Sequence, residues 1–270
     1  MRWPKLLGMI RTGVETMDFD QQRRQFADQG YAVFERVLEG ELLELLRAQC
    51  AAFVTREDDR MDAAGVDSLG ISHRGKRYFA SECQREQPAL RRILFSSAMA
   101  DICRATLGED AYFFFDQYVV KGPDGGLPFS WHQDSGYVVG NGGPVDHAAY
   151  LTCWCPLDDA TIENGTIRVL PFSQVPISRD WILPHERQTG TNDLVGWRGS
   201  EEGVAIEVPA GSVVAFSSHL LHASGANQTT DMRRAYLAQY TPEVMLNPGT
   251  RRLRRNAIPL ILDGVQVNYG

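Results

Sequence analysis

The sequence lacks any apolar run that approaches the ~18–20 residues needed to span a membrane. Its opening, MRWPKLLGMI, is short and has no small-residue cleavage site, so we expect that it is not a secretory signal. Internal repeats, low-complexity tracts and clear interdomain linkers are also missing. We therefore expect a soluble, cytoplasmic protein without membrane contacts, folded as a single domain over residues 1–270.

Cysteine pairs with the spacing of a metal site are missing as well. The five cysteines are scattered and none forms a CxxC pair. This pattern suits a reducing compartment and argues against a disulfide framework or a structural zinc site. Cys153 and Cys155 lie in the strand-like HAAYLTCWCPL, where alternate residues share a face, so we expect both to pack in the core.

Positive charge is also in short supply, because 27 Lys and Arg face 34 Asp and Glu, a net charge of −7. No global field therefore attracts polyanions. The one dense basic run, RRLRR at 251–255, is interpreted as a solvated face or a salt-bridge partner, since no recognition motif accompanies it. We expect no nucleic-acid partner, and the sequence leaves the oligomeric state open.

Two different periodicities divide what is present. In residues 1–110, ELLELLRAQCAAFV at 41–54 and SAMADICRATL at 97–107 repeat apolar side chains at three- and four-residue steps, which predicts a mainly helical part with a strand near 31–37. From residue 111 short β-rich runs follow, such as AYFFFDQYVV and GSVVAFS, bounded by Gly, Pro, Asn and Asp. This order predicts a β-sandwich or open barrel with helices packed outside.

One long segment interrupts the strands. Residues 175–203, VPISRDWILPHERQTGTNDLVGWRGSEEG, show little strand or helix periodicity. Such segments in a compact domain are usually lids or disordered. Because the segment carries Trp181, Leu183 and Trp197, we expect a lid that packs on the rest of the protein.

Residues 129–137, FSWHQDSGY, place two ionisable side chains among aromatic ones. Alternate residues of a strand share a side, so His132 and Asp134 can point to one place while Gln133 faces away. By themselves these residues favour a buried hydrogen-bonded pair that closes a turn. A metal site would need a third ligand from elsewhere, for which the chain offers His73, His147, His185, His219 and His222.

A second segment, HLLHASGAN, places His219 and His222 at a strand end, and Arg233 and Arg234 open the next strand. Two histidines and one carboxylate hold ferrous iron on one face and leave the other face open. A bidentate 2-oxo acid and dioxygen would fill the open positions, and an arginine is the suitable partner for the distal carboxylate of that acid.

These segments together resemble the phytanoyl-CoA dioxygenase-like family of Fe(II)/2-oxoglutarate-dependent oxygenases. The similar stretches are WHQD at 131–134, LDDATIENGTIRVLP at 157–171, PAGSVVAFSSHLLHASGAN at 209–227 and RRAY at 233–236, within a resemblance that covers most of residues 20–242. An isolated HxD is a weak signal, but the stretches in this order are a strong one. The resemblance implies an α+β fold in which residues 111–245 form a double-stranded β-helix, a cupin-like jelly roll, followed by a C-terminal segment at 246–270.

The resemblance also implies roles for single residues. His132, Asp134 and His222 match the iron ligands of the family. Arg233, eleven residues beyond His222 (222 + 11), matches the arginine that holds the distal carboxylate of 2-oxoglutarate, and Ser224 matches a hydroxyl that assists it.

Four further positions complete the expected site. Gln117 matches a polar position that lines the pocket in some relatives. Arg77 lies where some members supply a basic residue to the cosubstrate or the substrate, with a solvated surface charge as the alternative. Tyr137 leads into GYVVGNGG, where a pocket mouth is expected, and is the candidate substrate contact. His219 remains the competitor of His222 for the metal.

The activity implied is that of an oxygenase with Fe(II), 2-oxoglutarate and O2. It would hydroxylate a C–H bond of a small or medium-sized metabolite and release succinate and CO2. Desaturation and cyclisation stay open, whereas the carboxylate of Asp134 occupies the position that is vacant in related halogenases. PFSQ at 171–174 departs from the PGSH common in the family, which weakens the inference of substrate. A non-redox cupin-like isomerase and a small-molecule-binding barrel are the alternatives.

Overall fold

The computed structural model describes residues 19–269, and the opening MRWPKLLGMI lies outside them. The helices are α1 (Asp20–Gln29), α2 (Gly40–Ala64), α3 (Arg91–Leu94), α4 (Ser97–Thr106) and α5 (Asp134–Gly140), with short 3-10 turns η1 (Cys83–Arg85), η2 (Pro88–Leu90) and η3 (Pro176–Arg179). Both predicted helices are confirmed. α2 continues ten residues past Val54 (54 + 10 = 64) and ends where Gly65 adopts a left-handed φ of 65°. The side chain of Ser96 caps α4 by accepting a hydrogen bond from the Met99 N–H.

Two antiparallel sheets carry the site. The larger has the order β1 (Tyr31–Phe34), β12 (Val213–Ser217), β7 (Leu151–Pro156), β14 (Arg233–Thr241), β5 (Ala111–Lys121), β4 (Arg77–Ser81), β3 (Ser72–His73) and β2 (Ser68–Leu69), with β15 (Ile258–Leu262) and β16 (Val265–Gln266) attached beside β5. The smaller has the order β11 (Val204–Ala205), β8 (Ile167–Leu170), β13 (Leu221–Ser224) and β6 (Phe129–His132). β9 (Glu186–Arg187) and β10 (Leu194–Val195) pair separately.

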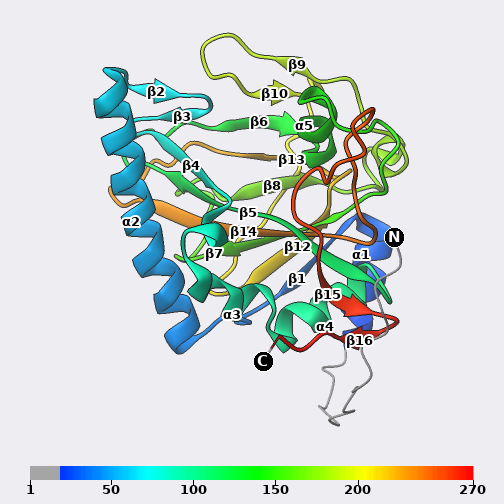
Figure 1. The fold of residues 1–270 in the computed structure, drawn as a ribbon. Coiled ribbons are helices and arrows are strands. Elements are labelled where there is room, and N and C mark those ends of the chain that lie inside the picture. Colours follow the sequence, from blue (N-terminus) through cyan, green and yellow to red (C-terminus); the bar gives the residue numbers. More distant parts are fainter. Residues whose placement is uncertain (1–18, 270) are drawn as a thin grey trace.

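The alternation of strand residues separates two apolar cores. On one face of the large sheet, Cys153 and Cys155 pack with the buried side of α2 and with α4, as expected for these cysteines. Trp154, between them in sequence, points to the other face and packs with residues of β8 and β12. Figure 1 shows α2 running along one side of the molecule, outside the strands. The helices therefore cover one face of the large sheet, and its other face packs against the small sheet through a second apolar core.

Two regions add detail that the periodicity did not contain. In the part expected to be mainly helical, the strand predicted near 31–37 is confirmed as β1. The same part also contributes β2 to β4, which are too short for a periodicity and join the sheet through the pairing of β4 with β5. The segment 175–203 holds η3, β9 and β10, and Figure 1 places β9 and β10 beside β6 and α5. Among residues 19–269, no helix is both long and apolar enough to cross a membrane.

Candidate active site

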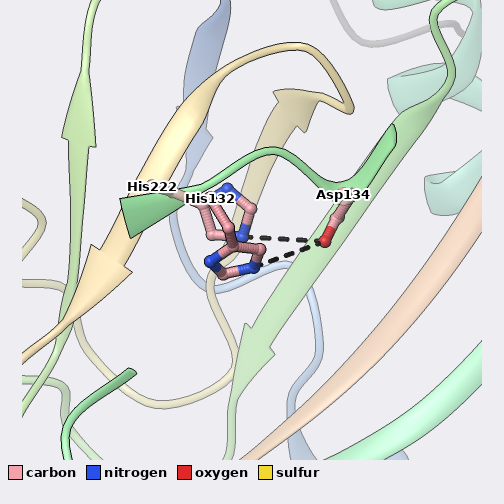
Figure 2. Close-up of side chains that lie close together, drawn as sticks. All are labelled: His132, Asp134 and His222. Carbon is pink, nitrogen blue, oxygen red and sulfur yellow. Dashed lines mark ion pairs between the residues drawn. The ribbon is translucent and has the colours of Figure 1, made fainter. Parts of the chain in front are cut away.

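Two histidines and one carboxylate converge between the sheets. His132 ends β6 and His222 lies directly opposite it in the neighbouring strand β13. Asp134 is the first residue of α5, so the strand ends earlier than the i, i+2 prediction assumed. Gln133 remains extended, with φ −107° and ψ 139°, and both flanking side chains still point the same way. Figure 2 shows the three side chains directed at one another, with ligand atoms within 4.8 Å.

Backbone carbonyls fix the tautomers of the two histidines. Nδ1 of His132 lies 2.7 Å from the Ser130 carbonyl, and Nδ1 of His222 lies 3.1 Å from the Leu220 carbonyl. Because a carbonyl can only accept, each Nδ1 carries the proton and each Nε2 presents a lone pair. Those Nε2 atoms lie 3.8 and 3.7 Å from Oδ1 of Asp134.

This arrangement places three electron-pair donors around one point. Burial, and then the neighbouring His222, lower the pKa of His132 well below its usual range, so its ring is neutral. Three electron-pair donors that face one another in this way repel unless a cation lies among them. Imidazole nitrogen and carboxylate oxygen are the donors that suit ferrous iron. The residues present therefore fit a divalent metal ion, and iron in particular.

The other oxygen of Asp134 is occupied. Oδ2 accepts hydrogen bonds from the Thr152 hydroxyl and, at 3.0 Å, from the side-chain amide of Gln239. The same amide also reaches the Thr152 hydroxyl at 3.0 Å. These bonds fix the carboxylate so that Oδ1 alone faces the histidines. Outer partners of this kind orient a metal ligand and tune its basicity.

A row of buried basic side chains borders the same pocket. Arg77, Lys121 and Arg233 are register partners on β4, β5 and β14, and each is at most 1 % exposed. All three line the pocket that contains His132 and Asp134. Register partners on adjacent strands point to the same face of the sheet, so these three side chains lie next to one another.

Arg233 has unused hydrogen-bonding capacity. Its Nη2 donates to the Gly165 carbonyl at 3.1 Å, while Nε and Nη1 are buried without a hydrogen-bond partner among the described residues. Burial lowers the pKa of Arg233 to about 10, so it remains charged at neutral pH. A buried, charged guanidinium with two free donors fits the carboxylate of a bound anion. Ser224, from β13, lines the same pocket, as does Gln117 from β5.

Lys121 lies beside Arg233 and was missed by the sequence reasoning. Burial, and then the charges of Arg233 and Arg77, lower its pKa to about 6. Its ammonium contacts the Gly225 carbonyl. A signal was available, because Lys121 follows Gln117 by four residues in a period-two strand and so shares its face.

Arg77 is neither solvated nor free. Its guanidinium forms a bidentate pair with Asp193, at 2.7 and 3.2 Å, and Asp193 is 2 % exposed. It also donates to the carbonyls of Ile71, Pro128 and Thr191. The alternative of a surface charge is wrong, since β4 carries Arg77 inward, and these partners already use the donors that a ligand would need.

Of two other predicted positions, only Tyr137 contacts the triad. The ring of Tyr137 stands edge-on to His132, with centroids 5.3 Å apart, and its hydroxyl accepts a hydrogen bond from the Leu194 N–H. Tyr137 lies in α5 and not in a glycine-rich loop. His219, the competitor of His222, points elsewhere: its Nδ1 lies 3.1 Å from the Arg179 carbonyl and its ring is 6.2 Å from that of His147.

Comparison with known proteins finds similar sequences over most of the chain. The family model described as "Phytanoyl-CoA dioxygenase (PhyH)" matches residues 26–235. A probable alpha-ketoglutarate-dependent hypophosphite dioxygenase from Stutzerimonas stutzeri is 24% identical over 245 residues, covering 82% of this chain and 78% of the relative. The ectoine dioxygenase of Halomonas elongata is 28% identical over 229 residues, covering 77% of this chain and 65% of the relative.

Solved structures share the fold at low identity. EctD from S. alaskensis, solved with 2-oxoglutarate and 5-hydroxyectoine, aligns with a TM-score of 0.65 and 21% identity over 91% of this chain and 86% of its own. EvdO2 from Micromonospora carbonacea var. aurantiaca, solved with 2-oxoglutarate, aligns with a TM-score of 0.64 and 23% identity over 87% and 95%.

The chain belongs to the phytanoyl-CoA dioxygenase (PhyH) family. It is an Fe(II)/2-oxoglutarate-dependent oxygenase, with Fe(II), 2-oxoglutarate and O2 as its cofactors and cosubstrates. The predicted family, reaction class and cofactors are thereby confirmed, and the alternatives of a non-redox isomerase and a simple binding barrel are set aside.

Proposed function

We propose that His132, Asp134 and His222 hold the iron and that Arg233 holds the distal carboxylate of 2-oxoglutarate. The observation that supports this most strongly is the juxtaposition, in one pocket, of the buried donor triad with an arginine whose Nε and Nη1 have no partner among the described residues. Ser224 and Lys121 line the same end and would assist Arg233. Trp154 lies under the Arg233 guanidinium, 5.5 Å from its centre, and limits the room around the carboxylate.

The reaction we propose is the hydroxylation of a C–H bond. One oxygen atom of O2 enters the substrate and the other enters succinate, while CO2 leaves the oxo acid. Bound iron would supply the activation of O2 that this chemistry requires. The protein residues have simpler tasks. Arg233 binds and orients the oxo acid by charge, and Lys121 offers it a hydrogen-bond donor. Thr152 and Gln239 hold Asp134 so that one oxygen faces the iron.

We further propose that the substrate is a small or medium-sized metabolite. Named relatives include the ectoine dioxygenase and the L-proline trans-4-hydroxylase of Streptomyces griseoviridis, which supports this size class. Phe79 and Phe129 line the pocket, which suits a substrate with apolar surface. The rings of Phe129 and Tyr137 both stand edge-on to His132. Tyr137 is the proposed substrate contact, whereas Arg77 is proposed to shape the pocket rather than to bind substrate.

The finer description of the fold belongs with this proposal. We interpret the two facing sheets, with β6 and β13 paired across the metal site, as a double-stranded β-helix of the jelly-roll kind. Residues 1–270 would form one oxygenase domain, and 175–203 its lid. The cytoplasmic location stays a prediction from the cysteine pattern.

A succinate-release screen tests the function. The protein, loaded with Fe(II) and supplied with 2-oxoglutarate and O2, is offered a panel of metabolites, and mass spectrometry identifies any substrate that gains one oxygen atom. We expect stimulated succinate formation with at least one compound and none from Asp134→Ala. Wild-type succinate formation by Asp134→Ala would refute the ligand assignment.

A further inference from the structure

The residue between the two proposed ligands does more than space them. Gln133 is fully buried, and its side chain points away from the triad into segment 175–203. Its amide nitrogen donates to the Trp181 carbonyl at 2.9 Å and to the His219 carbonyl at 2.6 Å, and its amide oxygen accepts from the Leu183 N–H at 2.7 Å. Both the nitrogen and the oxygen of the amide are therefore hydrogen-bonded to backbone groups of the segment or of the turn that precedes His222.

The backbone of Gln133 is held by the same segment. Its N–H donates to Nε2 of His185 at 2.9 Å, and Nδ1 of His185 lies 2.7 Å from the Leu183 carbonyl. Glycine makes room for this ring on both sides: a Cβ at Gly136 would lie 2.3 Å from it, and one at Gly196 would lie 2.4 Å from it. His185 is thus inserted between α5 and the end of the segment, against the motif that carries the ligands.

Further bonds continue this attachment on the far side of His185. The Leu194 N–H donates to the Tyr137 hydroxyl at 3.0 Å, and the Gly196 N–H donates to the Trp131 carbonyl at 2.8 Å. The buried pair of Asp193 with Arg77 lies next to them. The segment consequently contacts the chain before, between and after His132 and Asp134.

This geometry has a mechanical consequence. The extended conformation of Gln133 sets the directions in which His132 and Asp134 leave the backbone. Contacts that fix Gln133 therefore fix both ligands, and a metal ion that fixes both ligands favours the conformation in which Gln133 reaches the segment. Coupling of this kind is reciprocal, because each event changes the free energy of the other by the same amount.

We propose that Gln133 is a positioning residue that couples metal binding to the closure of segment 175–203, with His185 as its partner. The proposal rests on the proposed metal site. It assigns the segment a packed state that depends on the metal, rather than only on the substrate, because the segment holds the stretch of chain that carries two of the proposed ligands.

The test uses the full chain without turnover, with Co(II) as the metal probe. Two quantities are measured: the dissociation constant of Co(II), from its absorption spectrum, and the rate of tryptic cleavage in the segment, which exposes Arg179, Arg187 and Arg198. In the wild type, Co(II) should slow this cleavage several-fold. In Gln133→Ala, Co(II) affinity should fall about tenfold or more, and saturating Co(II) should no longer slow cleavage.

Matched variants make the outcome specific. Gln174→Ala removes an exposed glutamine just outside the segment and should behave as wild type. His185→Ala leaves Gln133 in place but removes its partner; it should reduce the protection by Co(II), and it carries the test if Gln133→Ala fails to fold. The coupling is overturned if bound Co(II) does not slow cleavage in the wild type, or if both variants retain wild-type affinity and protection. Failure of the wild type to bind Co(II), or equal binding by Asp134→Ala, would instead overturn the metal site itself and this inference with it.

Discussion

The side-chain amide of Gln239 donates a 3.0 Å hydrogen bond to Oδ2 of Asp134, the oxygen that faces away from the two histidines. Gln239 comes from β14, which also carries Arg233 six residues earlier (239 − 233 = 6) on the same face. β14 thus holds Asp134, a proposed metal ligand, through Gln239, and it also carries Arg233, the proposed partner of 2-oxoglutarate.

Removing the support of Asp134 should weaken metal binding. Thr152→Val and Gln239→Leu each delete one donor to Oδ2, so the carboxylate gains freedom to turn and its basicity changes. We expect each variant to bind Co(II) about 10- to 100-fold more weakly than the wild type, as measured by titration of the metal-free protein. Thr189→Val, at an exposed position, serves as the control. Wild-type affinity in both variants would show that the two bonds do not orient the ligand.

Replacing Arg233 should affect the cosubstrate and not the metal. Arg233→Leu removes the free donors of the pocket, and charge-assisted hydrogen bonds are worth about 1.5–3 kcal/mol each. The KM for 2-oxoglutarate should therefore rise by at least about tenfold, with Co(II) affinity unchanged. The exposed Arg252→Leu is the matched control. An unchanged KM would remove Arg233 from the proposed cosubstrate site.

Lys121 should lower the stability of the folded protein and strengthen the binding of 2-oxoglutarate. Its pKa is about 6 when folded against an ordinary 10.5, so between these pH values the unfolded chain binds more protons. Stability must then rise as pH increases through this window and fall as pH decreases. Lys121→Met should raise the free energy of unfolding at pH 7 by about 1–4 kcal/mol.

The advantage of Lys121→Met should shrink towards pH 10, where deprotonation costs the unfolded lysine little. The KM for 2-oxoglutarate should increase in the same variant, because the pocket loses a hydrogen-bond donor. Denaturant unfolding at pH 6, 7 and 9 and a cosubstrate titration measure the two effects. A variant that is less stable than the wild type at all three pH values would contradict the assignment of Lys121 as a strained buried cation.

The buried pair of Arg77 and Asp193 should behave as one unit. Asp193→Asn leaves the guanidinium without its counter-charge in a buried position, which should cost about 3–5 kcal/mol of unfolding free energy. In a double-mutant cycle with Arg77→Met, the loss in the double variant should be smaller than the sum of the single losses by about 0.5–3 kcal/mol. Losses that simply add would show that the two side chains do not depend on each other.

The sequence predicted the chemistry of the site more completely than its mechanics. His132, Asp134, His222 and Arg233 sit in motifs whose order along the chain is distinctive, and the structure brings all of them to one pocket. Period-two patterns in 111–121 and 233–241 also predicted the strands that frame this pocket.

The contacts that support the site could not be read in the same way. Thr152 and Gln239 reach Asp134 only because β7 and β14 are adjacent in the sheet, and strand order leaves no local signal. Likewise, Asp193 finds Arg77 across 116 residues of sequence. His185 lies in the segment with little periodicity, and two glycines far apart in the chain make a space for its ring. Long-range pairing decides these features, whereas composition and periodicity describe only neighbours.

The most direct test of the account is the anaerobic addition of 2-oxoglutarate to the Fe(II)-loaded protein, followed by visible absorption. Chelation of the oxo acid by iron gives a charge-transfer band, which we expect in the wild type and in His219→Ala but not in His222→Ala. A band that survives in His222→Ala and disappears in His219→Ala, or no band in the wild type, would contradict the proposed centre.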